Sequence, residues 1–317
     1  MTDAGPAVDL SVSIGGGRKG DPLHLANPII TAAGTCGTGV ELQRDIDLTA
    51  VGAFVTPAIT RRSHRRPGTV SPREVPAGLF LAGPYPSLSL RSVLNRSMAL
   101  WESWPVPVIA NIPAGDADEC FEIAAALADY ADIAAIELSF ISYASWLDVD
   151  DNLPELRRMY RRLRDAWPRP LIVKLPYGLT NTLALVDAAG DAGVDAVSLG
   201  GGFPARIVER GHAVERPRLV AGRVTGPATR PLALGMVAAI CAGTHVPVIA
   251  SGGVTSGTDA LDFLQAGARA VQVGSATLRD PGAVVRVARD LERLMRGTGR
   301  SSMPRLPTGI HDQSTPL

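Results

Sequence analysis

The chain has 317 residues, 46% of them hydrophobic, which is enough to bury a large core in one or two domains. Lysine and arginine together number 31, as do aspartate and glutamate, so no net charge recruits a polyanion or an anionic membrane surface. These numbers argue against nucleic acid and membranes as partners, and a small molecule is the expected ligand.

The N-terminal segment "MTDAGPAVDL" has neither a basic region nor an apolar one, and no run approaches the ~18 apolar residues of a membrane span. The pattern of a targeting or membrane segment is therefore missing. Next, residues 10–14 and 23–25 flank "GGGRKGD" and are typical of a β-hairpin, which we expect to close the bottom of the main fold.

From residue 28 onward, short apolar runs alternate with longer segments whose apolar residues recur at helical spacing. The expected strands are 28–31, 53–56, 108–111, 135–139, 171–175, 196–199, 248–250 and 270–273. The expected helices include 117–131, 153–167, 182–193, 231–243 and 256–268. Eight repeated strand–helix units predict a parallel sheet closed into a (β/α)₈ TIM barrel, and an open doubly wound sheet is the alternative.

The barrel is expected to form one domain over residues 1–300. The Pro-rich segment "SSMPRLPTGIHDQSTPL", residues 301–317, is expected to be a loosely attached extension. The three cysteines, Cys36, Cys120 and Cys241, are far apart and lack the spacings of zinc sites or of a disulfide framework. We therefore expect no metal site and a cytoplasmic protein, with Cys36 a buried, inert thiol rather than a reactive one.

Active sites of such barrels lie in the loops that follow the strands. The loops "ASGGVTSG" (250–257) and "VGSATLRD" (273–280) follow the last two strands and contain Gly252, Gly253 and Gly274. Glycines let the backbone N–H groups approach a ligand, and this is the usual phosphate position of the fold. The two loops favour a phosphate site, and tight turns without a ligand are the alternative.

Lys174 is the one lysine inside the eight predicted strands, and a buried ammonium requires an anionic or electron-rich partner. A lysine that reaches water from the barrel rim is the alternative. Asn111 ends the third strand and offers both a donor and an acceptor to a planar heterocycle. A phosphate site, a lysine and an amide at one barrel mouth indicate a phosphorylated aromatic cofactor.

Several segments resemble the soluble class 1 dihydroorotate dehydrogenases, in the same order over about residues 10 to 285. They are "NPIITAAGTCGTG" (27–39), "VIANIPAG" (108–115), "IVKL" (172–175), "GRVTGPATRPLALGMV" (222–237), "ASGGVTSGTDALDFLQAGA" (250–268) and "AVQVGSA" (270–276). This resemblance implies a TIM barrel that carries flavin mononucleotide (FMN). It also implies a homodimer, with an electron-transfer partner in some family members.

The resemblance also implies which residues bind FMN. Ala33 and Gly34 would lie against the isoalloxazine ring, and Asn111 and Lys174 would bind its polar edge. The remaining implied contacts are Gly222, Thr225 and Gly226 along the cofactor channel, and Ser251, Gly252, Gly253, Gly274 and Ser275 around the phosphate. This assignment agrees with the anion site inferred from the two glycine loops.

The substrate motifs of the family are altered in this chain. The family's lysine after the second strand is replaced by Pro57, which cannot donate a hydrogen bond. The family's asparagine-bearing loop reads "LAGPYPSLS" (81–89), and its "NISCPN" reads "SFISYA" (139–144). Its Asn-Thr pair after the sixth strand becomes Gly201 and Gly202. Each lost donor costs ~1–3 kcal/mol of binding, so we expect a substrate other than dihydroorotate.

Ser142 stands where the family has its catalytic base, and Ser139 stands where it has an asparagine. Serine is a weak base that needs a relay, so Tyr143, Tyr85 and Tyr177 are alternative proton carriers, or side chains that merely pack at the rim. With Lys174, we take Ser142 and Tyr143 as the catalytic candidates. Ser139, Tyr85 and Tyr177 are candidates for substrate binding.

Arg206 could bind a substrate carboxylate in a bidentate manner, or it could be an exposed loop arginine. The run "RRSHRR" (61–66) could attract an anionic substrate, or it could be a solvated lid, and His64 within it is a weaker acid–base candidate.

The favoured function is an FMN-dependent oxidoreductase that acts on a small cyclic or unsaturated substrate. This substrate could carry a carboxylate. A non-redox barrel lyase, isomerase or synthase that keeps the FMN or phosphate site is the alternative. A catalytically silent relative that binds a partner subunit is a third.

Overall fold

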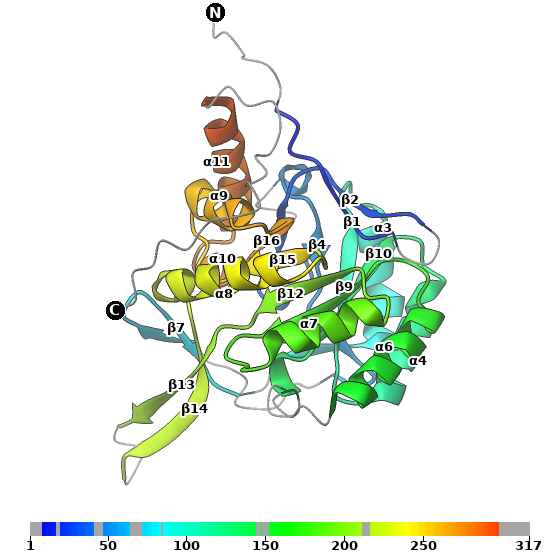
Figure 1. Cartoon of the computed structure of the whole chain (residues 1–317), viewed down its shortest axis with the longest axis horizontal. Coiled ribbons are helices and arrows are strands. Elements are labelled where there is room, and N and C mark those ends of the chain that lie inside the picture. Colours follow the sequence, from blue (N-terminus) through cyan, green and yellow to red (C-terminus); the bar gives the residue numbers. More distant parts are fainter. Residues whose placement is uncertain are drawn as a thin grey trace, which may run out of the picture.

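Eight parallel strands form the centre of the protein, seen in the computed structural model of the chain (Figure 1). The structure describes residues 8–16, 20–40, 47–63, 72–83, 85–143, 147, 152–210 and 216–297. The strands are β3 (Ile29–Thr31), β4 (Phe54–Val55), β9 (Val108–Pro113), β10 (Ile133–Ser139), β11 (Leu171–Pro176), β12 (Ala196–Gly200), β15 (Val248–Ser251) and β16 (Ala270–Val273). All eight overlap the predicted runs.

The sheet closes on itself. Its order is β3-β16-β15-β12-β11-β10-β9-β4, and a parallel bridge between Ile30 and Ala53 joins the two end strands. The predicted (β/α)₈ barrel is therefore confirmed, and the open doubly wound alternative is wrong.

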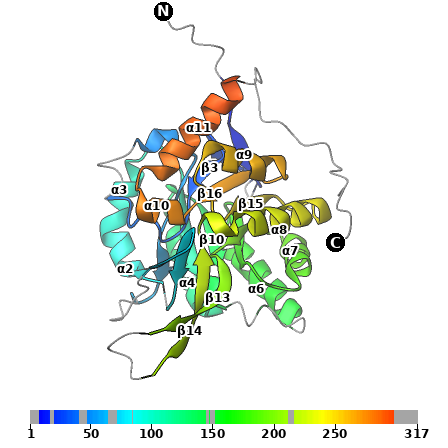
Figure 2. The ribbon, with the colours of Figure 1, turned by 90° about the vertical axis from the view of Figure 1, so that its left-hand side faces the viewer.

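Helices surround the sheet on its outside (Figures 1 and 2). The longer ones are α4 (Ala117–Ala128), α6 (Leu153–Ala166), α7 (Thr182–Asp191), α8 (Arg230–Gly243), α9 (Gly257–Gln265) and α11 (Ala283–Gly297). Shorter ones are α2 (Leu90–Ser92), α3 (Met98–Glu102) and α10 (Ser275–Arg279), with a π-helical turn at Val93–Ser97 and 3-10 turns at Leu48–Ala50, Ile141–Tyr143 and Pro227–Thr229. Capping residues explain where several of these helices begin. Ser256 and Asp259 form a capping box at the start of α9, and Asp116 caps α4.

The predicted N-terminal hairpin is present as β1 (Val12–Ile14) paired antiparallel with β2 (Leu23–Leu25). Its buried side chains, Ile14, Leu23 and Leu25, pack in one cluster with the apolar side chains that fill the lower barrel. The hairpin thus closes the amino-terminal end of the barrel, as expected.

The barrel interior is layered. An apolar layer comprises Ile30, Ala53, Val55, Ile109, Ala135, Ile172, Ala196, Ile249 and Ala270. Side chains on a strand repeat every second residue on one face, so the next inward positions lie two residues further along. In six strands these positions are polar: Asn111, Glu137, Lys174, Ser198, Ser251 and Gln272. A layer of polar side chains therefore lies above the apolar layer, at the carboxyl end of the barrel.

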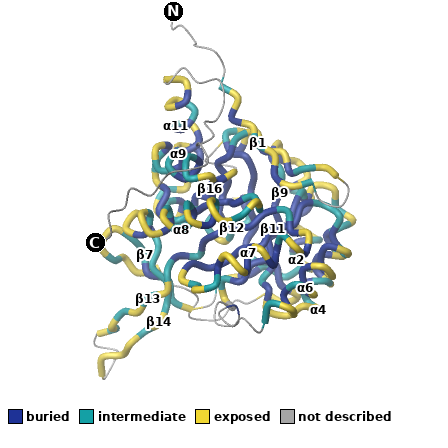
Figure 3. Tube along the Cα trace, viewed as in Figure 1, coloured by how far each residue is buried: buried dark blue, intermediate teal, exposed yellow. Residues whose placement is uncertain are grey.

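An antiparallel sheet that the sequence did not predict stands at this carboxyl end. Its order is β13-β14-β7-β6, formed by β13 (Phe203–Glu209), β14 (Arg218–Thr225), β7 (Gly78–Leu81) and β6 (Arg73–Val75). A small parallel pair, β5 (Ala58–Thr60) and β8 (Ser87–Ser89), lies in the same loops. The β13–β14 ribbon projects from the barrel (Figure 2), and much of its surface is exposed (Figure 3).

The proposed extension 301–317 and part of the basic run, residues 64–66 with His64, lie outside the described residues. Arg61, at the start of that run, pairs with Glu122 of α4 at 2.7 Å, and both side chains are about half exposed. Exposed pairs of this kind contribute little to stability.

Candidate active site

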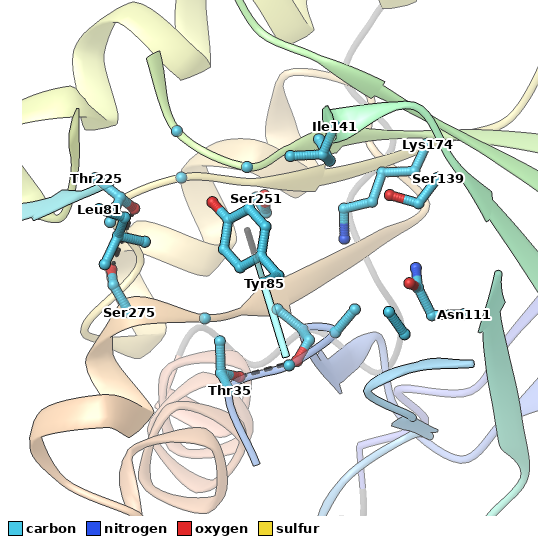
Figure 4. A pocket seen from close by; sticks show the side chains of 18 of the residues that line it. Thr35, Leu81, Tyr85, Asn111, Ser139, Ile141, Lys174, Thr225, Ser251 and Ser275 are labelled. Atoms are coloured by element: carbon cyan, nitrogen blue, oxygen red, sulfur yellow. Dashed lines mark hydrogen bonds between the residues drawn. The ribbon is translucent and has the colours of Figure 1, made fainter. Parts of the chain in front are cut away.

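A cavity opens at the carboxyl end of the barrel, between the parallel strands and the β14–β7 sheet (Figure 4). It holds about 1010 Å³ of space, counting its open mouth, which is sufficient for a nucleotide-sized ligand and a small second molecule. Most of the predicted site residues line it. They are Ala33, Gly34, Tyr85, Asn111, Ser139, Ser142, Lys174, Thr225, Ser251, Gly252, Gly253, Gly274 and Ser275.

Four predicted residues that the structure describes do not line this cavity, and the side chain of a fifth, Tyr143, is not described. The hydroxyl of Tyr177 donates to the carbonyl of Ser251 at 2.6 Å and its ring stacks on Phe203, so this side chain is structural. Arg206 is exposed on β13. Gly222 and Gly226 lie where a Cβ would meet the backbone of Leu81 or Gly78, so they permit close packing of the upper sheet. Tyr143 ends a 3-10 turn, and its side chain lies outside the described part of the structure.

Lys174 is buried, and its partner is a carboxylate from the neighbouring strand. Nζ of Lys174 donates to Oε1 of Glu137 at 3.2 Å and to Oε1 of Gln272 at 2.7 Å. Glu137 has no exposed surface and Lys174 is 5% exposed, which excludes a lysine that reaches water from the rim. The requirement for an anionic partner is therefore met inside the barrel.

Glu137 accepts four hydrogen bonds, two on each oxygen. Besides Lys174, Oε1 accepts from Nδ2 of Asn111 at 2.8 Å. Oε2 accepts from Oγ of Ser198 at 2.9 Å and from Nε2 of Gln272 at 2.6 Å. A buried carboxylate that accepts this many hydrogen bonds fixes the orientation of its neighbours. The amide of Asn111 is thereby oriented with its oxygen toward the cavity, and the ammonium of Lys174 points the same way (Figure 4).

The opposite end of the cavity is formed by glycine loops. Gly252 and Gly253 have φ values of +114° and +73°, and a Cβ on Gly253 would lie 2.6 Å from the carbonyl oxygen of Gly226. These residues therefore have to be glycine. The hydroxyl of Thr225 donates to that of Ser275 at 3.3 Å, at the start of α10, where backbone N–H groups lack helical partners. This end offers hydroxyls and N–H groups suited to an anion.

Hydroxyls and apolar side chains share the wall between these ends. Ser139, Ser142 and Tyr85 line it, and within the described residues their hydroxyl groups make no hydrogen bond to another protein group. At the second strand, Pro57 is buried and Ala58 faces the cavity. Burial raises the pKa of Tyr85, and the nearby Arg223 opposes this only in part. Tyr85 is therefore a neutral phenol near neutral pH.

Cys36 is buried, and desolvation raises its pKa, which keeps the thiol protonated. This agrees with the expectation of an unreactive cysteine. In the described ranges, no group of three or more His, Cys, Asp or Glu side chains is arranged to hold a metal ion.

Glu137, Ser198, Gln272 and Arg223 are absent from the predicted site. The first three carried a signal, because each is the one polar residue within an otherwise apolar run: "AIEL", "AVSL" and "AVQV". Period-2 alternation places these residues at the same level as Lys174. Arg223 had no such signal, since its position depends on the unpredicted upper sheet.

A closed parallel barrel with a buried lysine and a glycine cradle at its carboxyl end defines a TIM-barrel enzyme. The comparisons with known proteins agree. The family model described as dihydroorotate dehydrogenase matches residues 21–295.

Relatives named "Dihydroorotate dehydrogenase B (NAD(+)), catalytic subunit" align along nearly their full length. The protein of Geobacter sp. (strain M21) is 31% identical over 296 residues, covering 90% of this chain and 93% of its own. That of Geobacter sulfurreducens is 32% identical, covering 92% and 94%. That of Desulforudis audaxviator is 33% identical, covering 91% and 95%. The chain belongs to the dihydroorotate dehydrogenase family.

Proposed function

We propose that the protein is an FMN-dependent oxidoreductase that acts on a small cyclic or unsaturated substrate other than dihydroorotate. The observation that carries this proposal is a single cavity with two different ends. One end has the Lys174–Glu137–Asn111 network, which presents a cationic donor and an amide oxygen to a planar ligand. The other end has the glycine cradle around Gly252 and Gly253, which suits a phosphate.

The residues present fit FMN. Lys174 and Asn111 would hold the polar edge of the ring, Ala33 and Gly34 would lie beneath it, and a Cβ on Gly34 would point into open space. The phosphate would be held by the loop glycines with Thr225 and Ser275. When bound, FMN supplies a hydride acceptor.

The chain itself must orient the substrate and accept a proton from the carbon next to the one that loses hydride. Ser142 and Tyr85 are the cavity-lining candidates for the proton acceptor. Serine requires a relay to water, and Ser142 is exposed, which allows one. Tyr85 is protonated near neutral pH, so it suits donation to the substrate in the reductive direction. Ser139 can donate a hydrogen bond that orients the ring.

Dihydroorotate is a poor fit for this wall. Its ring needs hydrogen-bond partners along every polar edge, whereas Ala58, Leu81, Pro86, Pro113 and Ile141 contribute apolar surface here. A polar ring against such a wall leaves donors and acceptors unpaired, at about 1–3 kcal/mol each. A less polar ring or an unsaturated acid is favoured.

The purified protein is expected to be yellow and to lose its visible absorbance when the correct substrate is added without oxygen. Dihydroorotate is expected not to bleach it, and flavin reduction across a panel of candidate metabolites would identify the substrate. A colourless protein that cannot be reconstituted with FMN would contradict the proposal and favour a non-redox barrel enzyme. Bleaching by dihydroorotate at ordinary enzymatic rates would contradict the altered specificity.

Replacing Lys174 with alanine is expected to weaken FMN binding tenfold or more, because a charged hydrogen bond contributes about 1.5–3 kcal/mol. Equilibrium dialysis of the apoprotein with FMN measures this. Unchanged affinity would refute the role given to Lys174.

Further parts of the proposal concern partners and location. The relatives' name describes a catalytic subunit that works with NAD(+), which supports an electron-transfer partner for this chain as well. We also propose a homodimer, by analogy with the family. None of the helices in the described ranges is long and apolar enough to cross a membrane. The free thiols of Cys36, Cys120 and Cys241 suit the reducing cytoplasm.

A further inference from the structure

Arg223 lies on the cavity-facing side of the upper sheet. In the β14–β7 pairing, Arg223 is opposite Leu81 and Thr225 is opposite Leu79. Cross-strand partners, and residues two apart on one strand, share a face of the sheet. Leu81 and Thr225 line the cavity, so Arg223, which does not itself line it, is directed to the same side at its edge.

The guanidinium of Arg223 is fixed by backbone carbonyls. Nε donates to Gly201 at 2.7 Å, while Nη2 donates to Gly202 at 2.7 Å and to Tyr177 at 3.1 Å. Gly201 and Gly202 line the cavity and stand where the family has its Asn-Thr pair. Three carbonyls thus hold one edge of the guanidinium, while Nη1 has no hydrogen-bond partner among the described residues.

The charge of Arg223 is not balanced. No carboxylate in the described ranges forms an ion pair with it, in contrast to Arg73 and Arg218 on the same sheet, which both pair with Glu209. Burial lowers the pKa of Arg223, and Tyr85 is the one titratable group that opposes this. A half-buried guanidinium with carbonyl partners alone attracts an anion when one enters.

We propose that Arg223, with the hydroxyl of Tyr85 beside it, forms an anion subsite at the cavity mouth that binds a carboxylate of the substrate. This inference rests on the proposed function, because it concerns the substrate side of the same cavity. It transfers to Arg223 the role that the sequence suggested for Arg206, which is exposed further along the ribbon.

The FMN phosphate is the other anion that could occupy such a subsite. The cradle for the phosphate is formed by the loops after β15 and β16, around Gly252, Gly253 and Gly274. Arg223 is fixed instead to the ends of β11 and β12, through Tyr177, Gly201 and Gly202. The subsite therefore lies on the side of the cavity that Ile141 and Ser142 line.

The test measures the binding of benzoate, nicotinate and fumarate, each against its neutral amide, to the full chain by calorimetry. In the wild-type protein at least one carboxylate is expected to bind about tenfold to a hundredfold more tightly than its amide, the range of a charged hydrogen bond. Arg223→Gln is expected to remove this preference and to keep the flavin. Arg216→Gln, at an exposed arginine two residues before β14, is expected to keep both.

A second pair of variants leaves Arg223 and its carbonyl contacts in place. Leu81→Glu puts a carboxylate on the residue opposite Arg223 and is expected to abolish the preference for carboxylates. Leu81→Gln introduces a neutral side chain of the same shape as glutamate and is expected to retain that preference. This pair decides the matter if Arg223→Gln does not fold.

Three results would overturn the subsite. The first is a wild-type protein that shows no preference for any carboxylate over its amide. The second is a preference that survives in Arg223→Gln or in Leu81→Glu. The third is loss of flavin together with anion binding in Arg223→Gln, which would assign Arg223 to the cofactor phosphate. Calorimetry does not depend on flavin, so a colourless protein that keeps the carboxylate preference would reject the FMN proposal and support the subsite.

Discussion

Replacing Glu137 with glutamine is expected to lower the free energy of unfolding by about 3–5 kcal/mol and to abolish FMN retention. Removing one partner of a buried ion pair leaves the other charge uncompensated, and costs of this size are typical. Lys174 is 5% exposed, so water replaces the lost carboxylate only in part. Both expected effects follow from one atom change, from oxygen to an NH₂ group.

No orientation of the new amide satisfies the network. If its NH₂ faces Lys174 and Asn111, it meets two donors. If it faces Ser198 and Gln272, the hydroxyl can rotate to accept, but the amide of Gln272 still donates. Rotating the amide of Gln272 by 180° would direct the NH₂ of Gln272 at Lys174. In the wild-type protein Lys174 donates to the amide oxygen of Gln272 at 2.7 Å. At least one buried donor therefore always faces another.

Urea unfolding and flavin occupancy measure the two effects separately. Glu74→Gln on the exposed strand β6 is the matched control, and its stability should stay within about 0.5 kcal/mol of the wild type. The double variant Glu137→Gln, Lys174→Met removes the unpaired ammonium, so it is expected to recover part of the stability without recovering flavin. Wild-type stability of Glu137→Gln would refute the buried ion pair.

The barrel was predictable because its strands are buried on both sides. Such strands read as continuous apolar runs, and "LIVKL" and "AVQV" became β11 and β16 with ends shifted by a residue at most. The upper sheet was not predictable from the same signal. The segments "FPARIVE" and "RLVAGRVT" do not form continuous apolar runs, because arginine, glutamate, proline or glycine interrupts them. They are stabilised by pairing with each other and, for β14, by pairing with β7 across a long sequence separation.

The site residues, too, differ in whether the sequence could predict their positions. Residues at strand ends, such as Asn111 and Lys174, have positions fixed by the barrel, and the glycine loops follow strands directly. Arg223 and Tyr177 needed the three-dimensional arrangement. Tyr177 follows β11, as an active-site residue would, yet its ring turns away to stack on Phe203. Side-chain direction after a strand is set by local packing, which the spacing of residues does not encode.

Replacing Gly253 with alanine is the second change with a large expected effect, namely loss of FMN together with a drop in stability. The φ of +73° costs an L-residue about 1–3 kcal/mol. The new Cβ would also lie 2.6 Å from the carbonyl oxygen of Gly226 and 2.9 Å from Cβ of Arg230. Backbone contacts cannot yield as a flexible side chain can, so the loop must move, and the phosphate cradle moves with it.

Gly235→Ala is the matched control for this change. Gly235 lies on the exposed side of α8, and nothing is within 4 Å of the Cβ position. Alanine there is expected to raise the free energy of unfolding by about 0.8–1.0 kcal/mol through helix propensity, with flavin retained. The same chemical substitution thus has opposite expected signs at two glycines about 18 residues apart, and thermal unfolding with flavin absorbance measures both. Full FMN retention in Gly253→Ala would mean that the phosphate is bound elsewhere in the cavity, and the glycine pair would then be only a tight turn.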